Sequence, residues 1–315
     1  MIVHIYSTDQ FVLPLPPGHR FPMPKYARLR ARVAALADER MRIAPRATDD
    51  ELVRAHSPEY VQAVTQGTLD PRAMRRIGFP WSPAMVERSR RSAGATIAAC
   101  RSALDHGAGV NLAGGTHHAH REHGEGFCVF NDAVVAIRAM QAERRVRRAL
   151  IVDLDVHQGD GTADILAGDD SVHTLSLHGR NNFPFRKRAS RQDVELEDGT
   201  RDASYLATLR IALDRALERG PFDLGIYLAG ADPYVGDRLG RLALSKAGLA
   251  RRDAFVFDRL AGHDIPVAVT MAGGYAEDVD DVVDIHFATV AAALERFGAG
   301  SQPGRCSMTL AEVGR

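Results

Sequence analysis

The sequence predicts an α/β protein built on one mostly parallel sheet with helices on both faces. Short apolar runs alternate with segments of helical periodicity from about residue 107 onwards, which is the pattern of parallel strands joined by helical crossovers. Four of the apolar runs end in unusual polar residues, and such strand ends can meet at one edge of a sheet. No repeat or shift in composition divides the 315 residues. We therefore expect one domain over residues 1–298 and a flexible tail over residues 299–315.

The N-terminal third predicts one strand followed mainly by helices. Ser57 before Pro58 is typical of a helix start, and Ser82 provides a second N-cap. The expected elements are a strand over Met1–Tyr6, an irregular proline-rich segment over Val12–Pro24, helices over Lys25–Met41 and Ser57–Gln66, a loop over Pro71–Pro80, and a long helix from Ser82 to about Gly107.

The rest of the chain predicts alternating strands and helices. Short apolar runs suit strands that are buried on both faces of a parallel sheet. After the third of these strands we expect a basic loop that extends to about Asp193. The expected strands are Val110–Ala113, Arg148–Asp155, Val172–His178, Leu224–Gly230 and Pro266–Ala272, and the expected helices are Asn131–Glu143, Ala203–Arg219, Ser245–Gly262 and Val279–Phe297.

The composition argues against several classes of protein. The 40 basic and 40 acidic residues balance, so no overall field favours nucleic acid or an anionic membrane. No apolar run approaches the roughly 20 residues that cross a bilayer, and the first residues do not resemble a signal peptide. Cys100, Cys128 and Cys306 are too widely spaced to indicate a disulfide framework or a thiolate zinc site. We expect a cytoplasmic protein that binds neither nucleic acid nor membrane.

Asp155, His157 and Asp232 are candidate metal ligands. The first two follow the apolar run Ala149–Val152, and Asp232 ends a second apolar run. Two aspartates and one histidine with an open fourth position fit catalytic zinc better than structural zinc, and iron(II) fits nearly as well. A second metal would require an acid at position 159, which is Gly159. Taken singly, the aspartates are also explained as loop caps or turn residues.

Two adjacent histidines, His117 and His118, lie in the glycine-rich segment GGTHHAHREHGEGF. Zinc lowers the pKa of its water to about 7, so an imidazole beside it is suited to accept the proton. Asp153 and Asp160 are carboxylates that could orient the two rings. As an alternative, both histidines are exposed loop residues.

Tyr275 follows Gly273 and Gly274 at the end of the apolar run PVAVTMA. A phenol placed there could donate to a carbonyl oxygen and stabilise the oxyanion of a tetrahedral intermediate. The two glycines would let the backbone approach closely. The alternative is an ordinary aromatic residue after a turn.

Several further side chains have a simple structural interpretation. Phe127 and Phe183 belong to the core, unless together they form the walls of a narrow apolar channel. We interpret His120 and His123 as solvated side chains, and the basic cluster Arg186–Arg191 as a solvated loop.

Taken together, the motifs resemble the histone deacetylase family. GGTHHAHREHGEGFCVFND, IVDLDVHQGDGT, TLSLH, LAGAD and AGGY occur in the order of that family, over residues 1–297. GHRFPMPKYARLR, HSPEY and VELEDGT are most similar to the class IV branch and its bacterial relatives. The resemblance implies an arginase–deacetylase fold, with a central sheet of about eight strands, and a zinc-dependent deacetylase domain over residues 1–298.

The resemblance also implies a role for each residue of the site. It implies zinc bound by Asp155, His157 and Asp232; catalysis by His117, His118 and Tyr275; orientation of the histidines by Asp153 and Asp160; an acyl-lysine channel along Gly126, Phe127, Phe183, Gly273 and Gly274; and a structural potassium ion held by Asp153, Ser176 and the carbonyls of Asp155, His157 and Leu177.

The function implied is a zinc-dependent amidohydrolase that removes an acetyl or longer fatty acyl group from lysine side chains of proteins or peptides. One alternative is a deacetylase of small acylated amines such as acetylpolyamines. Another is a non-catalytic module that binds a metal or an acyl group. No acidic residue in the early loops matches the peptide-binding aspartate of the family, which leaves the substrate open.

Overall fold

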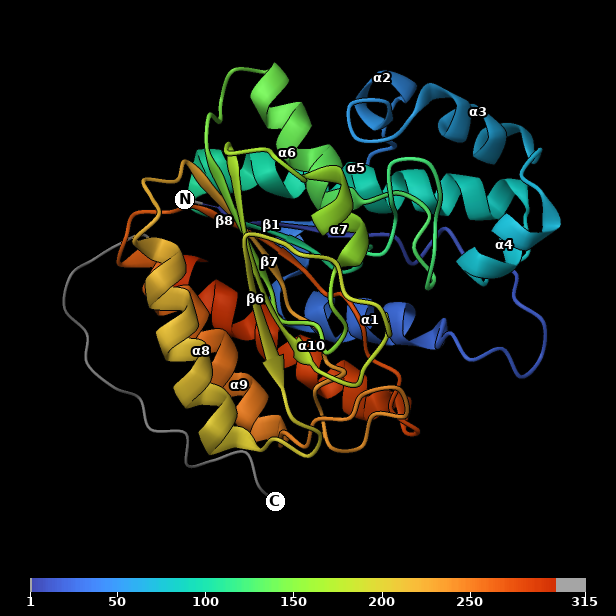
Figure 1. Ribbon diagram of the computed structural model, residues 1–315. Coiled ribbons are helices and arrows are strands. Elements are labelled where there is room, and N and C mark those ends of the chain that lie inside the picture. The colour runs from blue at the N-terminus through green and yellow to red at the C-terminus, as the bar shows by residue number, and fades with distance from the viewer. Residues whose placement is uncertain (1, 299–315) are drawn as a thin grey trace.

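Eight parallel strands run through the centre of the molecule in the order β2-β1-β3-β8-β7-β4-β5-β6 (Figure 1). The computed structural model describes residues 2–298, and the predicted tail 299–315 lies outside them. The predicted α/β class and parallel sheet are confirmed. The strands are β1 (His4–Ser7), β2 (Met41–Ile43), β3 (Ala108–Asn111), β4 (Ala149–Asp153), β5 (Val172–Gly179), β6 (Gln192–Leu196), β7 (Leu224–Leu228) and β8 (Val267–Thr270).

Helices cover both faces of the sheet (Figure 1). One face is covered by α1 (Pro24–Ala37), α8 (Asp202–Leu217), α9 (Lys246–Ala261) and α10 (Val279–Gly298). The opposite face is covered by α5 (Pro83–His106) and α6 (Asp132–Ala142). The shorter elements are α2 (Asp49–Leu52), α3 (Pro58–Gln66), α4 (Pro71–Ile77), α7 (Asp160–Ile165) and the 3-10 turn η1 (Asp38–Arg40).

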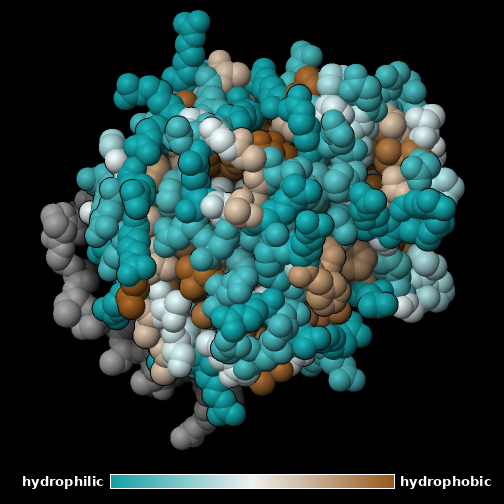
Figure 2. All heavy atoms as spheres, in the orientation of Figure 1, coloured by the Kyte–Doolittle hydropathy of each residue, from teal (hydrophilic) through white to brown (hydrophobic). Residues whose placement is uncertain are grey.

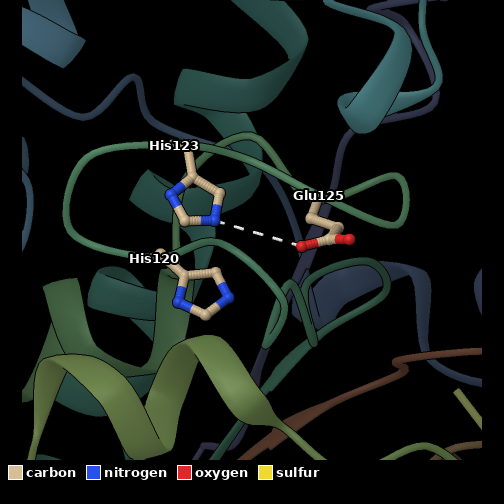
Figure 3. A group of neighbouring side chains, drawn as sticks. All are labelled: His120, His123 and Glu125. Atoms are coloured by element: carbon tan, nitrogen blue, oxygen red, sulfur yellow. Dashed lines mark ion pairs between the residues drawn. The ribbon is translucent and has the colours of Figure 1, made fainter. Parts of the chain in front are cut away.

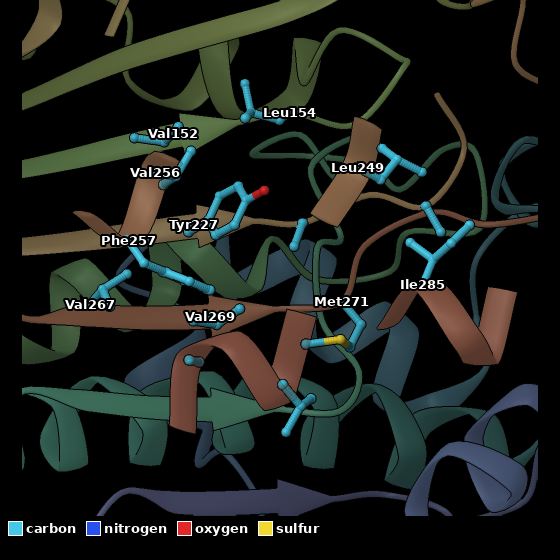
Figure 4. Close-up of a cluster of buried hydrophobic side chains, with 14 of the residues drawn as sticks. Val152, Leu154, Tyr227, Leu249, Val256, Phe257, Val267, Val269, Met271 and Ile285 are labelled. Carbon is cyan, nitrogen blue, oxygen red and sulfur yellow. The ribbon is translucent and has the colours of Figure 1, made fainter. Parts of the chain in front are cut away.

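Two apolar cores lie between the sheet and its helices. Figure 4 shows part of the core beneath α9 and α10, where Val152, Tyr227 and Val269 of the strands meet Val256 and Phe257 of α9. Every residue of β4, β7 and β8 is buried, because helices cover both faces of these central strands. The face of the molecule in Figure 2 is largely hydrophilic, with hydrophobic side chains in small separate groups.

The edge strand β6 was not predicted. Its first two residues fall in the expected basic loop, which was placed up to about Asp193, and Val194–Leu196 fall in a stretch for which no element was predicted. An edge strand exposes alternate side chains and lacks the apolar run of a central strand, so its pattern is weak. The predicted helix over Lys25–Met41 is also too long: α1 ends at Ala37, and Met41 begins β2, a strand of only three residues.

The predicted loop over Pro71–Pro80 is wrong, since this segment contains α4. The Asp70 side chain accepts hydrogen bonds from the N–H groups of Arg72 and Ala73, and Pro71 occupies the first turn. Gly78 ends the helix in the left-handed conformation. Seven residues are too few for a clear 3.6-residue periodicity, so only these end signals marked the helix.

The carboxyl ends of β3, β8, β7 and β4 lie side by side, because these strands are consecutive in the sheet. The segments that follow them contribute Gly114–His118, Gly273, Tyr275, Asp232 and Asp155 to the wall of one cavity. The expectation that the polar strand ends converge is therefore confirmed.

Candidate active site

Asp155, His157 and Asp232 lie together at the carboxyl edge of the sheet. One potential ligand atom from each residue lies within 4.8 Å of the others, and all three residues are buried. His157 Nδ1 lies 2.9 Å from Asp155 Oδ1 and 3.3 Å from Asp232 Oδ2. The parallel pairing of β4 with β7 holds this geometry, because it aligns the segments that carry the two aspartates.

The surroundings of this cluster fit a divalent cation. Asp232 Oδ2 is buried and has no hydrogen-bond partner among the described residues, although its other oxygen accepts the Val156 N–H at 2.9 Å. A Cβ on Gly273 would overlap Asp232 Oδ2 and would lie 2.6 Å from Asp155 Oδ2, so a glycine keeps the space beside both carboxylates open. Two carboxylates and one imidazole suit zinc and also iron(II).

The electrostatics of the cluster also favour a bound cation. Burial, reinforced by the nearby Asp155 charge, raises the pKa of Asp232 to about 7. Burial opposes a charge on His157, but the adjacent carboxylates of Asp155 and Asp232 outweigh that effect and raise the pKa of His157 to about 10. The two buried carboxylates therefore need a nearby positive charge, which a proton on His157 or a bound cation can supply.

His117 and His118 face this cluster, and each is bound to a different carboxylate. His117 Nδ1 lies 2.7 Å from Asp153 Oδ2, and His118 Nδ1 lies 2.6 Å from Asp160 Oδ1. The two ring centroids are 4.2 Å apart. The structure thus places Asp153 and Asp160 beside the two histidines, which come from the segment after β3.

The two imidazoles differ in their protonation. Burial opposes a charge on His117, but the carboxylates of Asp153 and Asp155 prevail and raise its pKa to about 9. Burial and the neighbouring His117 charge lower the pKa of His118 to about 4, against the effect of Asp160. At neutral pH the pair therefore combines one protonated ring with one ring that can accept a proton.

Tyr275 lines the same cavity, and its backbone is held from both sides. Its N–H donates to Asp237 Oδ2 at 2.6 Å, and its carbonyl accepts from Arg238 Nε at 3.0 Å. Burial, with the charges of Asp155 and Asp232, raises the pKa of the phenol well above its usual value. The hydroxyl therefore stays protonated and remains a donor. Nothing in the sequence singles out Asp237 or Arg238, since both precede Tyr275 by more than 30 residues along the chain.

A cavity of about 500 Å³ opens onto these groups. Much of its wall is apolar, and part of that wall comes from residues that the sequence analysis did not identify. Phe21, in the irregular segment before α1, packs against Phe79 and Phe127 with centroid distances of 4.9 and 5.4 Å. Further apolar side chains in the wall are Leu13, Tyr26, Met85, Val129 and Phe130.

Phe127 and Phe183 both line the cavity. Gly126 and Phe127 have φ angles of 55° and 66°, and a Cβ on Gly126 would lie 2.9 Å from the His118 ring. The edge of Phe183 meets His118 with a centroid distance of 4.9 Å. The tight glycine therefore allows the Phe127 segment to approach His118 closely.

Lys25 is a buried cation in this wall. Its Nζ lies 3.4 Å from the carbonyl of Gly274 and 5.4 Å from the centroid of the Tyr275 ring. This contact joins the start of α1 to the segment that carries the phenol.

His120, His123 and Glu125 form a second group of potential ligands (Figure 3). The interpretation of His120 as solvated is wrong: it is buried, with Nδ1 3.0 Å from Asp164 Oδ2 and Nε2 3.4 Å from Asp160 Oδ2. His123 is only partly exposed, and its ring stacks on that of His120 at 4.3 Å. The neighbouring carboxylates come from α7, which the sequence analysis did not predict.

The residues that the resemblance assigns to a potassium ion are also neighbours. Asp153 and Ser176 are directly paired in the register of β4 with β5, and Leu177 follows Ser176. The Asp155 N–H donates to Asp153 Oδ1 at 3.2 Å. Carboxylate, hydroxyl and carbonyl oxygens of this kind suit a hard cation.

The sheet and the site at its carboxyl edge define an α/β protein of the arginase–deacetylase fold. Residues 20–290 match the sequence profile of the histone deacetylase domain. The chain belongs to the histone deacetylase family, which places it among hydrolases that act on amide bonds. The finer similarity to class IV stays a prediction.

Relatives and solved structures agree with this assignment. An uncharacterized protein of Picosynechococcus sp. is 44% identical over 90% of this chain and 95% of its own length. Histone deacetylase 2 of Arabidopsis thaliana is 33% identical over 74% of this chain, but the match spans only 62% of the plant protein. An HDAC homolog complexed with SAHA superposes with a TM-score of 0.79 at 23% identity, covering 96% of this chain and 85% of its own. An HDAC homolog from Aquifex aeolicus gives 0.78 at 22% identity, covering 95% and 89%. Within residues 2–298, no helix combines the length and apolarity needed to cross a bilayer.

Proposed function

We propose that this protein hydrolyses the amide bond between an acyl group and a lysine side chain, with a zinc ion held by Asp155, His157 and Asp232. The observation that carries the proposal is one cavity that joins this ligand set, two histidines bound to carboxylates, and a protonated phenol. Iron(II) is the second metal that the donor set would accept.

When bound, the cation would polarise the amide carbonyl and make a water molecule easier to deprotonate. His118, neutral at physiological pH, accepts the proton of the attacking water. Tyr275 donates its hydroxyl hydrogen to the carbonyl oxygen as negative charge develops there. The protonated His117 adds positive charge beside the reacting centre, and the proton held on the histidine pair passes to the leaving amine.

The shape of the cavity supports an acylated lysine as the substrate. Phe127 and Phe183 would flank the methylene stem, and Gly273 would leave room beside the reacting carbonyl. Gly274 does not line the cavity, because its Cβ position faces Val282 and Ala231. The apolar wall around Phe21 offers space for acyl groups longer than acetyl. Because a homolog of the same fold is complexed with SAHA, we expect SAHA to bind in this cavity and to inhibit the enzyme.

A structural potassium ion forms the second part of the proposal. It would be held by Asp153, Ser176 and the carbonyls of Asp155, His157 and Leu177. Asp153 also contacts the ring of His117, so the ion would hold in place the carboxylate that orients this histidine. Exchange of potassium for a larger cation should then change the rate more than the affinity for substrate.

The test is hydrolysis by purified, zinc-loaded protein of one lysine peptide carrying acetyl, trifluoroacetyl, octanoyl or myristoyl, alongside acetylated polyamines. We expect amine release from at least one acylated peptide. Tyr275→Phe should keep its zinc and lose at least about 100-fold in kcat, the scale of removing one oxyanion donor. Tyr234→Phe, outside the cavity, is the matched control and should retain its rate. Full activity of Tyr275→Phe would refute the role of the phenol.

A further inference from the structure

Exposed arginines from three separate segments surround the opening of the active-site cavity. Arg20 lies between β1 and α1, Arg76 lies in α4, and Arg241 lies between β7 and α9. Each of them lines the cavity and is exposed to solvent. The three side chains therefore stand where the cavity meets the solvent, and we call them the arginine rim.

Each member of the rim is adjacent to an aromatic wall of the cavity. The carbonyl of Arg76 accepts the N–H of Gly126 at 3.1 Å, next to Phe127. The N–H of Arg241 donates to Asn182 Oδ1 at 3.2 Å, next to Phe183. Arg20 directly precedes Phe21, which packs on the Phe127 ring. A substrate that enters between these walls must pass the rim.

The acids near the opening offset the positive charge of the rim only in part. Asp237 is committed to backbone, since it accepts the N–H groups of Leu239, Gly240 and Tyr275. Glu125 is only partly exposed and lies 4.0 Å from His123. Within residues 2–298, Arg20 and Arg76 form no ion pair, whereas Arg241 has an exposed one with Asp198 at 3.3 Å. The opening therefore presents positive charge to an approaching molecule.

We propose that the arginine rim selects acyl-lysine peptides whose flanking residues are acidic, and disfavours polycationic acylamines. The proposal rests on the proposed function and names the substrate class of that site. One exposed ion pair changes affinity by up to a few-fold, and salt screens it. With two or three such pairs, we expect about a tenfold preference in kcat/KM for acidic over basic flanks at low salt.

The test compares peptides with the same acyl-lysine flanked by aspartate, serine or lysine, at low and high salt. We expect the order aspartate, serine, lysine, with the difference shrinking at high salt. The triple variant Arg20→Glu, Arg76→Glu and Arg241→Glu should reverse this order. The control is a triple variant with the same change in charge at exposed sites outside the cavity, Arg54→Glu, Arg201→Glu and Arg210→Glu. This control should keep the wild-type order of the three peptides.

Three outcomes would overturn the proposal: equal kcat/KM for all flanks, an order that the rim variant leaves unchanged, or preference for a small anionic acylamine over every peptide. Turnover of the serine peptide tests the proposed function by itself. Fluorescence anisotropy with the Tyr275→Phe protein measures the binding of the same peptides, so the rim is tested even if no peptide is hydrolysed.

A second inference rests on a separate observation, a row of alternating acidic and basic side chains behind His118. Asp160 binds His118 through Oδ1 at 2.6 Å and faces His120 through Oδ2 at 3.4 Å. His120 faces Asp164 at 3.0 Å, and Asp164 Oδ1 lies 2.7 Å from Arg188. The row thus leads from a catalytic histidine to an exposed arginine of the loop before β6.

The geometry favours a positioning role for His120 over a second metal site. Both of its ring nitrogens already face carboxylates, and its ring is nearly parallel to that of His123, at 14°. The lone pairs of two stacked rings run side by side and do not converge on one ion. We infer that His120 is a positioning residue that holds Asp160 in place for His118.

Substitution at His120 separates these possibilities. His120→Asn should lower kcat about tenfold, with little change in KM or in zinc content, and His120→Lys should restore much of the rate by returning a cation. His123→Asn is the matched control and should keep the rate. Equal losses in both variants, no rescue by lysine, or a second bound zinc ion that both variants lose would overturn the inference.

Discussion

Replacing Asp232 by asparagine should stabilise the metal-free protein and abolish its stabilisation by zinc. Asp232 is buried beside Asp155, and one of its oxygens has no hydrogen-bond partner among residues 2–298. Asparagine keeps an oxygen that can accept the Val156 N–H, while it removes the buried charge. The substitution therefore separates the electrostatic cost of the site from its capacity to bind a cation.

The size of the effect follows from the pKa of this carboxyl group. Its rise from 3.8 to about 7 corresponds to about 4 kcal/mol of lost stability at neutral pH. Because the folded protein holds this proton more tightly than the unfolded chain does, the cost is absent below pH 3.8 and grows until about pH 7. Metal-free Asp232→Asn should therefore gain up to about 4 kcal/mol near pH 7.5 and almost nothing near pH 4.

Urea unfolding of chelator-treated protein measures this difference directly. Zinc at about 100 times its Kd should add about 2.7 kcal/mol to the stability of the wild type and nothing to that of Asp232→Asn. If the metal-free variant is less stable than the wild type at pH 7.5, the electrostatic reasoning is refuted. If zinc stabilises both proteins equally, Asp232 is not a ligand.

Three further substitutions probe the site and the fold. Gly273→Ala should weaken zinc binding at least about tenfold by calorimetry, since its Cβ would overlap Asp232 Oδ2, whereas Gly225→Ala, with its nearest contact at 3.5 Å, should bind normally. Burial lowers the pKa of His56 from 6.5 to about 4. The free energy of unfolding should therefore fall by about 3 kcal/mol as the pH drops from 6.5 to 4, and His56→Gln should remove this pH dependence. Phe257→Ala, at a fully buried site, should cost about 3–5 kcal/mol in urea unfolding.

The sequence predicts the centre of the fold better than its margins. Central strands such as β4 and β7 are buried on both faces, so their apolar runs stand out from the rest of the chain. The edge strand β6 and the short helix α4 expose much of their surface, and their composition resembles that of a loop. Burial creates the pattern on which sequence analysis depends, and where burial is partial the pattern weakens.

The same distinction applies to the site. Residues that directly follow apolar strands, such as Asp155 and Asp232, were identifiable because strand ends meet at one edge of a parallel sheet. Phe21, Lys25 and His120 lie in the loops or at the start of a helix, and their contacts join segments far apart in the sequence. No local spacing encodes such contacts, so only the folded structure places these residues in or behind the cavity wall.

Amide hydrolysis by the same protein before and after its metal is removed tests whether the cation held by Asp155, His157 and Asp232 is required. Acyl-lysine peptide is supplied to chelator-treated enzyme, to enzyme reloaded with zinc, and to reloaded Asp155→Ala, with released amine as the readout. We expect no turnover without metal, recovery with zinc, and no recovery in the variant. Equal turnover in the chelated and reloaded enzyme, or recovery in Asp155→Ala, would contradict this expectation.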